Sequence, residues 1–580
     1  MLNSIDNVLR DLSEEQRTAC KAQGNILLTA CPGSGKTRTL THRLAYLVAK
    51  KPESYKLNIA ITYTNRAADE IIKRLDDMAV DSSTIWAGTI HQFCMRFIIR
   101  PYAMYSKRLC KGYKIIDEYC KQEYGYALAQ KLGLHLDLYT DPFEYKAVQR
   151  EYEKILEENK EIDFDMILRF SNDLLFSNPF IASNLSSTIN SILVDEFQDT
   201  NELQYLILST IYKSNRSIEL VFAGDTNQAI YGSLGGVAKN QKELEELYDT
   251  TFNTMSLTGC YRSTKRLVDL YRKLEITKTN AYSVAKHRDE CGHINYCNSV
   301  DRKDLTDEIA TIISSALKNG IEPSEICVVA PQWSLLFGLA PKLRELLPDI
   351  SFDAPDISPI KYDPLNPLFL ISQLLFMPAG KNVTLRKRIA TEFITSVRDD
   401  FRITISDNVQ SYDILYTVNG CKEIDPDGIV CLKHAINRIF KMLNVQLQKE
   451  KELSKLIEAF FSKIASRVKR YSISTDYESV CKYFKRRKGV VINTIHGVKG
   501  EEYTTVIAFG LLNGYLPNWE YIIDYQKQLI RKNETCKMLY VLCSRAKKNL
   551  YLFSERGHKT KKNGKEYTPT DELSLIKDML

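Results

Sequence analysis

Short apolar segments alternate with amphipathic helical segments in the first part of the chain, and each apolar segment ends in small, polar or acidic residues. Such runs are typical of strands that are buried on both faces, and strands that alternate with helices favour a parallel sheet. The predicted strands of this part are Ile26–Thr29, Asn58–Thr64, Trp86–His91, Ile192–Val194 and Leu220–Ala223.

The same alternation returns after about residue 280. The predicted strands of this second part are His293–Ser299, Ile326–Ala330, Val490–Asn493, Thr505–Gly510 and Asn549–Phe553. We therefore predict an α/β protein with two parallel-sheet cores.

Two stretches lack the strand pattern and are predicted to be helical insertions, one within each core. The basic helix ends of the second insertion are consistent with a nucleic-acid face or with a solvated surface. The predicted division is 1–94 and 189–279 for the first core, 95–188 for its insertion, 280–379 and 487–580 for the second core, and 380–486 for a short second insertion.

Length and composition limit the classes of protein that fit. At 580 residues the chain is expected to form about three to five domains or subdomains. Hydrophobic residues make up 44% and charged residues 26%, a globular balance, and the formal net charge of +7 permits a polyanionic partner without requiring one. The opening residues form no apolar leader, and no run reaches the ~20 apolar residues of a membrane span. The 14 cysteines are therefore predicted to be free thiols of a cytoplasmic protein.

The segment Ile26–Arg38, ILLTACPGSGKTR, has the pattern of a phosphate-binding turn. A buried strand leads into Gly33–Gly35, and Lys36 and Thr37 begin a helix. In such a turn the backbone N–H groups and the positive helix end bind phosphates, the lysine reaches the β and γ phosphates, and the hydroxyl can ligate Mg²⁺. Ala30 replaces the first glycine of the usual pattern, which is acceptable where the backbone needs no positive φ.

Two adjacent acids, Asp195 and Glu196, follow a predicted strand of the same core. Neighbouring residues at a strand end point in different directions. Asp195 can therefore hold magnesium while Glu196 orients or deprotonates an attacking water. Gln228 follows the next strand, where its amide can contact the γ phosphate.

Gln16 has two interpretations that the residues alone leave open. Ser13 and Gln16 have the spacing of a helix capping box. A glutamine just before a phosphate loop can equally pair its amide with the edge of adenine. Downstream, Tyr261 can stack on a base and Arg262 can reach phosphate, although an isolated pair of this kind is usually a surface feature.

Polar residues also follow the second and third predicted strands. In open α/β sheets ligands bind at the carboxyl ends of the strands. Tyr63, Thr64, Asn65 and Thr89 are therefore predicted to contact a phosphate backbone. His91 has the same position in the pattern, although a lone histidine is more often structural.

Taken in order, these stretches resemble the motifs of the UvrD/Rep/PcrA group of superfamily 1 helicases. The stretches that resemble motifs I, Ia, Ib, II, III, IV, V and VI are ACPGSGKTRTLTHRLAYLV, ITYTNRAADE, GTIHQF, VDEFQDTNELQ, AGDTNQAIYG, CYRST, TIHGVKGEEY and YVLCSRAKKNL. The resemblance covers both predicted sheets and is weak in the insertions. It implies two RecA-like cores in a 1A/1B/2A/2B layout with a reduced 2B.

The resemblance implies that ATP and Mg²⁺ bind between the two cores. It favours an adenine contact for Gln16 and a ribose-side contact for Glu502. The implied catalytic residues are Lys36, Thr37, Asp195, Glu196, Gln228 and, reaching the γ phosphate from opposite sides, Arg262 and Arg545. The implied nucleotide-binding residues are Gln16, Ala30, Cys31, Pro32, Gly33, Ser34, Gly35, Lys36, Thr37, Arg38, Tyr261 and Glu502, with Thr37 and Asp195 on the metal.

The resemblance also implies ATP-driven movement along single-stranded DNA in the 3′ to 5′ direction and the opening of tailed duplex DNA. RNA is disfavoured as the substrate by the resemblance only. The implied DNA contacts are Tyr63, Thr64, Asn65, Thr89, His91, Tyr231 and His496.

Some positions depart from the family pattern. Ser233 and Leu234 stand where an aromatic residue and an arginine are usual, Cys260 stands where asparagine is usual, and Cys31 where glycine is usual. A lost aromatic platform, worth ~1–3 kcal/mol per base, affects unwinding more than ATP hydrolysis. The alternative function is therefore a nucleotide- and DNA-gated ATPase switch that controls a partner nuclease. Small UvrD-like proteins of phage-defence systems such as Gabija resemble this design.

Overall fold

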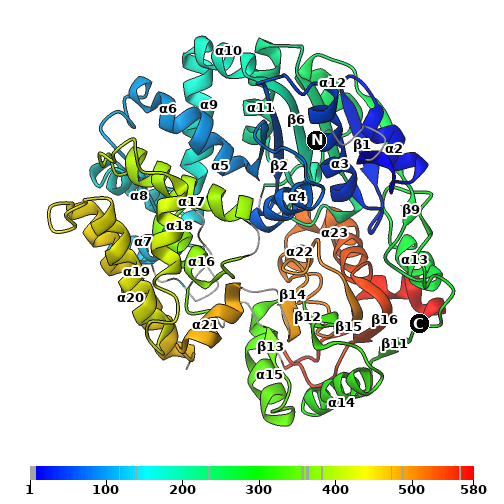
Figure 1. The fold of residues 1–580 in the computed structure, drawn as a ribbon. Helices are drawn as coiled ribbons and strands as arrows, with labels where there is room; N and C mark the ends of the chain where they lie inside the picture. Colours follow the sequence, from blue (N-terminus) through cyan, green and yellow to red (C-terminus); the bar gives the residue numbers. More distant parts are fainter. Residues whose placement is uncertain are drawn as a thin grey trace.

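The computed structural model describes residues 8–116, 118–134, 136, 141–232, 235–353, 358–360, 363, 365–380, 383–471, 473–484, 489–560 and 564–580. Figure 1 shows two sheets on the right of the molecule, one above the other, and the helices of residues 367–484 together on the left. Each sheet has six parallel strands, which confirms the predicted α/β class with two parallel-sheet cores. Among the described helices, none combines the length and the apolar character that a bilayer crossing requires.

The first sheet has the strand order β3-β2-β6-β7-β1-β8. Its strands are β1 (Ile26–Ala30), β2 (Leu57–Thr62), β3 (Ile85–Thr89), β6 (Ile189–Asp195), β7 (Glu219–Gly224) and β8 (Asn253–Leu257). Because β6, β7 and β1 are neighbours and parallel, their carboxyl ends meet at one edge. This order brings the phosphate turn, the two acids and Gln228 together.

The second sheet has the order β11-β16-β15-β12-β14-β13. Its strands are β11 (Ile294–Cys297), β12 (Ile326–Ala330), β13 (Phe352–Asp353), β14 (Val490–Thr494), β15 (Tyr503–Ala508) and β16 (Ala546–Phe553). Every residue of β12 and of β14 is buried, as the apolar runs predicted. The edge strands β8 and β13 were not predicted, because β8 is largely exposed and β13 has only two residues.

Two predicted strands of the first core run too far, because a capped helix begins sooner than the apolar pattern suggests. The Thr64 hydroxyl accepts from Ala67 N at 3.2 Å, so β2 ends at Thr62 and α4 begins at Asn65. Thr89 caps α5 (Ile90–Cys94) in the same way, so His91 lies in a helix and not at a strand end. The prediction that β3 reaches His91 is therefore wrong.

Helices cover both faces of the first sheet. Alternate strand residues enter two different hydrophobic cores, with Leu27 and Ile59 in one and Leu28 and Ala60 in the other. The elements around this sheet are α2 (Glu14–Lys21), α3 (Lys36–Lys50), α4 (Asn65–Asp77), η4 (Phe197–Asp199), α11 (Glu202–Ser214), η5 (Thr226–Gln228) and α12 (Gln241–Tyr248), whereas α13 (Lys265–Arg272) packs on the core of the second sheet. The short parallel pair β9 (Gly259–Cys260) and β10 (Tyr282–Ser283) follows β8 in the chain.

The second sheet has its own set of helices. Val491 and Ile492 are adjacent on β14, and each belongs to a different hydrophobic core. The elements around it are α14 (Leu305–Lys318), η7 (Pro323–Glu325), α15 (Trp333–Leu346), α22 (Glu520–Ile523), α23 (Tyr525–Cys543) and η9 (Asp571–Met579).

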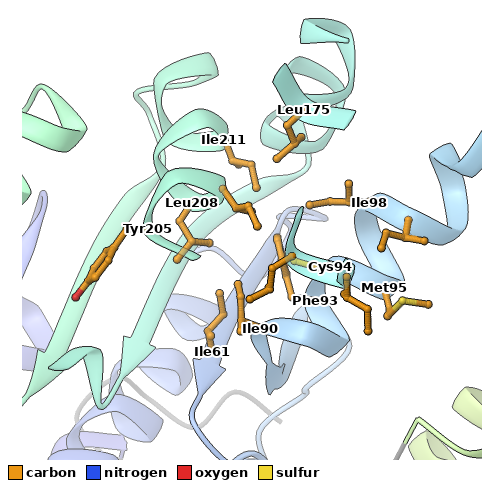
Figure 2. Close-up of a cluster of buried hydrophobic side chains, with 14 of the residues drawn as sticks. Ile61, Ile90, Phe93, Cys94, Met95, Ile98, Leu175, Tyr205, Leu208 and Ile211 are labelled. Atoms are coloured by element: carbon orange, nitrogen blue, oxygen red, sulfur yellow. The ribbon is translucent and has the colours of Figure 1, made fainter. Parts of the chain in front are cut away.

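The first insertion continues the hydrophobic core of the first sheet. Its elements are η1 (Met95–Ile99), α6 (Arg100–Tyr102), η2 (Ala103–Tyr105), β4 (Lys114–Ile115), α7 (Glu118–Lys131), η3 (Pro142–Glu144), α8 (Lys146–Glu158), β5 (Glu161–Ile162), α9 (Phe164–Ser177) and α10 (Pro179–Ser187). Figure 2 shows Ile61 of β2, Phe93 of α5 and Leu208 of α11 in one buried cluster. The insertion is mainly helical as predicted, with one short parallel pair, β4 and β5.

The second insertion has a separate core that includes Leu374, Phe393 and Phe440. Its helices are α16 (Pro367–Phe376), α17 (Val383–Asp399), α18 (Ser411–Asn419), α19 (Gly428–Met442), α20 (Lys451–Tyr471) and α21 (Tyr477–Phe484). Because α16 belongs to this core, the helical region begins before residue 380, and the domain division given above stays a prediction.

The second insertion is joined to the first core and its insertion by charged residues. Arg100 Nη2 donates to Asp400 Oδ2 at 2.7 Å, and Arg100 Nη1 donates to Glu392 Oε1 at 2.7 Å. The Arg100 side chain is 4% exposed, so this ion pair is buried between α17 and the first insertion. Arg388 Nη2 also donates to the Ala87 carbonyl of β3, so the helices of residues 367–484 in Figure 1 contact the first core as well as its insertion.

Candidate active site

The phosphate-binding turn predicted after β1 is formed. Gly33 and Gly35 have φ angles of +74° and +79°, which side chains other than glycine rarely adopt. Helix α3 has no side-chain cap, so the amide donors of its first turn are available to an anion. The buried Ser34 hydroxyl also has no hydrogen-bond partner among the described residues. The turn therefore fits the phosphates of a nucleotide.

Lys36 lies between the two acids. Its Nζ is 2.6 Å from Glu196 Oε1 and 3.2 Å from Asp195 Oδ1. Burial opposes the charge of Lys36, but the two carboxylates raise its pKa above the ordinary value. Burial likewise opposes the charge of Glu196, but Lys36 lowers the pKa of that carboxyl to about 2. Glu196 is therefore a carboxylate at neutral pH, while burial raises the pKa of Asp195.

Thr37 and Asp195 offer oxygen ligands for a divalent cation. The Thr37 hydroxyl donates to Asp195 Oδ2 at 3.1 Å, and the Asp195 side chain is 4% exposed. A hydroxyl and a carboxylate beside a phosphate turn are ligands that Mg²⁺ prefers. The residues thus fit the metal predicted for them.

A chain of hydrogen bonds connects Glu196 with Gln228. Gln198 Nε2 donates to Glu196 Oε2 at 2.5 Å, and the Asp225 backbone N–H donates to Gln198 Oε1 at 3.1 Å. Gln228 Nε2 in turn donates to Asp225 Oδ2 at 2.8 Å. Burial raises the pKa of Asp225 to about 6. These bonds connect the Gln228 amide with the carboxylate of Glu196.

Arg545 reaches this amide from the second core. It lies between α23 and β16 and is 1% exposed. Its Nη2 donates to Gln228 Oε1 at 3.0 Å, and its Nε donates to the Val541 carbonyl at 2.9 Å. Burial lowers the pKa of Arg545 to about 9, and the nearby Arg262 contributes to the shift. The guanidinium is still a cation at neutral pH, and both cores contribute to one site.

Comparison with known proteins shows the family of the chain. The family model described as UvrD/REP helicase N-terminal domain matches residues 12–148 and 128–249, and the model described as UvrD-like helicase C-terminal domain matches residues 429–557. The chain belongs to the UvrD/Rep/PcrA-like superfamily 1 helicases.

Two curated relatives illustrate the similarity. The ATP-dependent DNA helicase PcrA of Staphylococcus aureus is 27% identical over 359 residues, which is 56% of this chain and 48% of that protein. The ATP-dependent DNA helicase UvrD1 of Mycobacterium tuberculosis is 30% identical over 301 residues, which is 45% of this chain and 39% of that protein. The chain thus spans about half the length of the curated relatives it matches, or less.

The second arginine expected in this UvrD-like site packs directly on the phosphate turn. A Cβ on Gly33 would lie 2.5 Å from the Cβ of Arg262. Arg262 Nε donates to Glu502 Oε2 at 2.7 Å, and its Nη1 donates to the Ser544 carbonyl at 2.9 Å. Burial opposes the charge of Glu502, but Arg262 lowers its pKa. Arg262 therefore links the turn to the second core.

Gln16 makes the capping box that was one of its two interpretations. Its Oε1 accepts from Ser13 N at 3.1 Å, and its backbone N–H donates to the Ser13 hydroxyl at 3.3 Å. Its Nε2 donates to the Ser34 carbonyl at 2.9 Å, so Gln16 also holds the phosphate turn. Tyr261 nearby is 48% exposed. The contacts of Gln16 and Tyr261 with a base stay predictions.

Lys499 was missed by the sequence analysis, although it lies within the stretch that resembles motif V. Its Nζ donates to Asp199 Oδ1 at 2.8 Å and Oδ2 at 2.6 Å, and also to the Gln228 carbonyl. Burial lowers the pKa of Lys499 and raises that of Asp199 to about 6. A second missed contact runs from the Tyr540 hydroxyl to Asp225 Oδ2 at 3.2 Å. Both Lys499 and Tyr540 lie within stretches that resemble family motifs, and that position is the signal that could have found them.

Three of the predicted DNA contacts meet where the first core touches the second, a place called the rim from here on. The rings of Tyr63 and Tyr231 stack with centroids 4.6 Å apart, and the His496 ring lies 5.5 Å from that of Tyr231. The Tyr231 hydroxyl donates to the His496 carbonyl at 3.1 Å. Tyr63 is 41% exposed, so this group offers an aromatic surface at the rim.

The other predicted DNA contacts have mainly local partners. Thr64 and Thr89 cap α4 and α5, and the Asn65 Oδ1 atom is buried with no hydrogen-bond partner among the described residues. His91 packs on the Phe164 ring with centroids 5.6 Å apart, and burial lowers its pKa to about 4. Their contacts with DNA stay predictions.

Two of the departures from the family pattern, Cys31 and Cys260, lie beside the turn. Cys31 and Cys260 are both buried, and a Cβ on Gly33 would lie 3.1 Å from the Cys260 Sγ atom. Burial raises the pKa of Cys31, so this thiol is protonated at neutral pH. Ser233 and Leu234 lie outside the described residues.

Proposed function

We propose that this chain is an ATP-dependent DNA helicase that moves along single-stranded DNA in the 3′ to 5′ direction. The observation that carries the proposal is the bond from Arg545 Nη2 to Gln228 Oε1, which joins the two cores at the phosphate turn. Both named relatives are described as ATP-dependent DNA helicases, which supports ATP and DNA as the substrates.

In this proposal the turn and the first residues of α3 bind the phosphates of ATP, and Lys36 neutralises their charge. Thr37 and Asp195 would hold Mg²⁺, which would supply positive charge to neutralise the phosphates. Glu196, which is ionised at neutral pH, orients the attacking water and accepts its proton. Gln228 positions the γ phosphate from the end of β7.

Arg262 and Arg545 stabilise the charge that develops on the transferred phosphoryl group. Arginines in this role increase kcat ~10³- to 10⁵-fold. Because Arg545 belongs to the second core, hydrolysis depends on the approach of the two cores. Alternate closing and opening then loosens one core's hold on the strand and moves it along the rim formed by Tyr63, Tyr231 and His496.

The test measures ATP turnover with and without single-stranded DNA, followed by strand displacement on duplexes with a 3′ or a 5′ tail. We expect DNA to stimulate turnover and only the 3′-tailed duplex to open. A chain that hydrolyses no ATP, or that opens only the 5′-tailed duplex, contradicts the proposal. Stimulated turnover without opening of either duplex indicates the alternative, a DNA-gated ATPase that regulates a partner nuclease.

A further inference from the structure

An ion pair between Arg66 and Glu501 joins the two cores. Arg66 is the second residue of α4 in the first core, and its Nη1 donates to Glu501 Oε1 in the second core. The Arg66 side chain is 69% exposed, whereas that of Glu501 is 14% exposed. Arg66 directly follows Tyr63, Thr64 and Asn65 in the chain. The exposed partner therefore lies among the predicted DNA contacts.

Glu501 also connects with the nucleotide site. Its backbone carbonyl accepts from Arg545 Nη1 at 3.1 Å, and its carboxylate accepts from the Tyr503 hydroxyl. The Tyr503 backbone N–H donates to the Arg545 carbonyl at 2.9 Å. One residue thus holds an exposed arginine at the rim and the catalytic arginine in the interior.

The chemistry of Arg66 suits a phosphate as well as a carboxylate. A guanidinium binds either anion through paired N–H donors. An ion pair with an exposed partner is weak, so a backbone phosphate at the same place can replace Glu501. The exposed ring of Tyr63 lies three residues away in the chain, and basic groups beside aromatic rings bind single strands without regard to sequence.

We propose that Arg66 is a contact for the phosphate backbone of single-stranded DNA, and that Glu501 competes with the phosphate for it. When the strand takes Arg66, Glu501 is released, and the carbonyl that holds Arg545 Nη1 is released with it. Arg545 then turns more freely toward the γ phosphate. The proposal rests on the proposed function for its ATPase part and adds a residue that couples DNA binding to turnover.

The DNA part is tested by binding of a fluorescent oligothymidylate to the full-length chain at several salt concentrations, without nucleotide. For Arg66→Ala we expect weaker binding and a salt dependence reduced by about 0.7 in slope, which corresponds to one lost phosphate contact on a single strand. Arg66→Lys should keep the slope. Arg74→Ala is the matched control, because Arg74 lies on the same helix and pairs with Glu70. A wild-type slope in Arg66→Ala overturns the proposal.

The coupling part is tested with Glu501→Gln, which keeps the backbone carbonyl and an acceptor for Tyr503. Without the competing charge, DNA affinity and DNA-independent ATP turnover should both rise about two- to fivefold. This factor corresponds to the interaction free energy of an exposed ion pair. Turnover at saturating DNA should equal that of the wild type. Unchanged affinity or unchanged DNA-independent turnover overturns the competition.

The two proposals fail separately. If the wild-type chain hydrolyses no ATP, or is not stimulated by DNA, the proposed function fails, while the salt slope still reports on Arg66. If the wild type is stimulated but the Arg66 and Glu501 variants behave like it, the proposal for Arg66 and Glu501 fails in both its parts and the proposed function stands.

Discussion

Each core has its own parallel sheet, but the residues predicted for the nucleotide site lie at opposite strand ends in the two cores. In the first core the phosphate turn, Asp195 and Gln228 follow the carboxyl ends of β1, β6 and β7. In the second core, Glu502 and Arg545 directly precede β15 and β16, so they lie at amino ends. The first core contributes the residues predicted to bind the phosphates and the metal. The second core adds Arg545, whose side chain reaches Gln228 of the first core.

This comparison predicts that the largest losses come from the first core. Lys36→Ala and Glu196→Gln should each abolish ATP turnover, because one removes phosphate neutralisation and the other removes the base. Glu196→Gln should still bind nucleotide, since the turn and Lys36 remain. Steady-state turnover and equilibrium binding of a fluorescent ATP analogue measure the two effects. Wild-type turnover in either variant contradicts the assigned chemistry.

Removal of the cation from the second core should have the next largest effect. Arg545→Ala is expected to lower kcat at least a hundredfold and to leave nucleotide affinity measurable, because ground-state binding belongs mainly to the first core. Lys548→Ala is the matched control, since Lys548 is near in the chain and pairs on the surface with Glu290. A near-normal kcat for Arg545→Ala means that the second core does not complete the site.

The Lys499–Asp199 ion pair predicts a pH dependence. Asp199 has a pKa of about 6 in the fold, above its ordinary value, so it is ionised above pH 6 and neutral below. ATP turnover of the wild type should fall about tenfold as the pH drops through 6, because Asp199 loses its charge. Turnover of the Asp199→Asn variant should be low and independent of pH over this range.

The Asp199 carboxyl binds its proton more readily in the folded chain than in the unfolded chain, so its protonation stabilises the fold as the pH falls from 6. Circular dichroism at pH 5.5 should therefore show a folded chain, and an unfolded one contradicts the explanation.

The smallest effect is expected at the attachment of α2. Glu15 accepts from the Thr258 backbone N–H at 3.0 Å and from its hydroxyl at 2.6 Å, three residues before Tyr261. Glu15→Ala should raise KM for ATP a few-fold and leave kcat nearly unchanged, because Tyr261 loses its support. Glu15→Gln should restore KM, and the exposed neighbour Glu14→Ala should not change it. A lower kcat with unchanged KM in Glu15→Ala contradicts a role in base binding.

The same asymmetry explains how much of the molecule could be predicted from its sequence. The phosphate-turn pattern predicted the role of Lys36, and the positions of Asp195 and Gln228 after predicted strands assigned them to metal and γ phosphate, all from the residues alone. Arg545 was found only through the resemblance, because no local pattern marks an amino strand end as functional. The Lys499–Asp199 pair joins residues 300 positions apart and depends on how the two sheets face each other.

Competing local hydrogen bonds account for the other differences between the predicted and the observed structure. The apolar pattern extended β3 to His91, but the capping box of Thr89 and Gln92 begins a helix first. Gln16 could be assigned to a cap or to adenine, and its amide in fact holds the Ser34 carbonyl as well. Such choices depend on a single hydrogen bond, which periodicity does not report.

The central claim is that one hydrolytic site is shared by the two cores through Arg545 and Gln228. A double-mutant cycle in kcat at saturating ATP and DNA tests it most directly, with Arg545→Ala, Gln228→Ala and the combined variant. If the two side chains act together, the combined variant should be less than about threefold slower than Arg545→Ala alone. If the two losses multiply in full, Arg545 and Gln228 act independently and the shared site is contradicted.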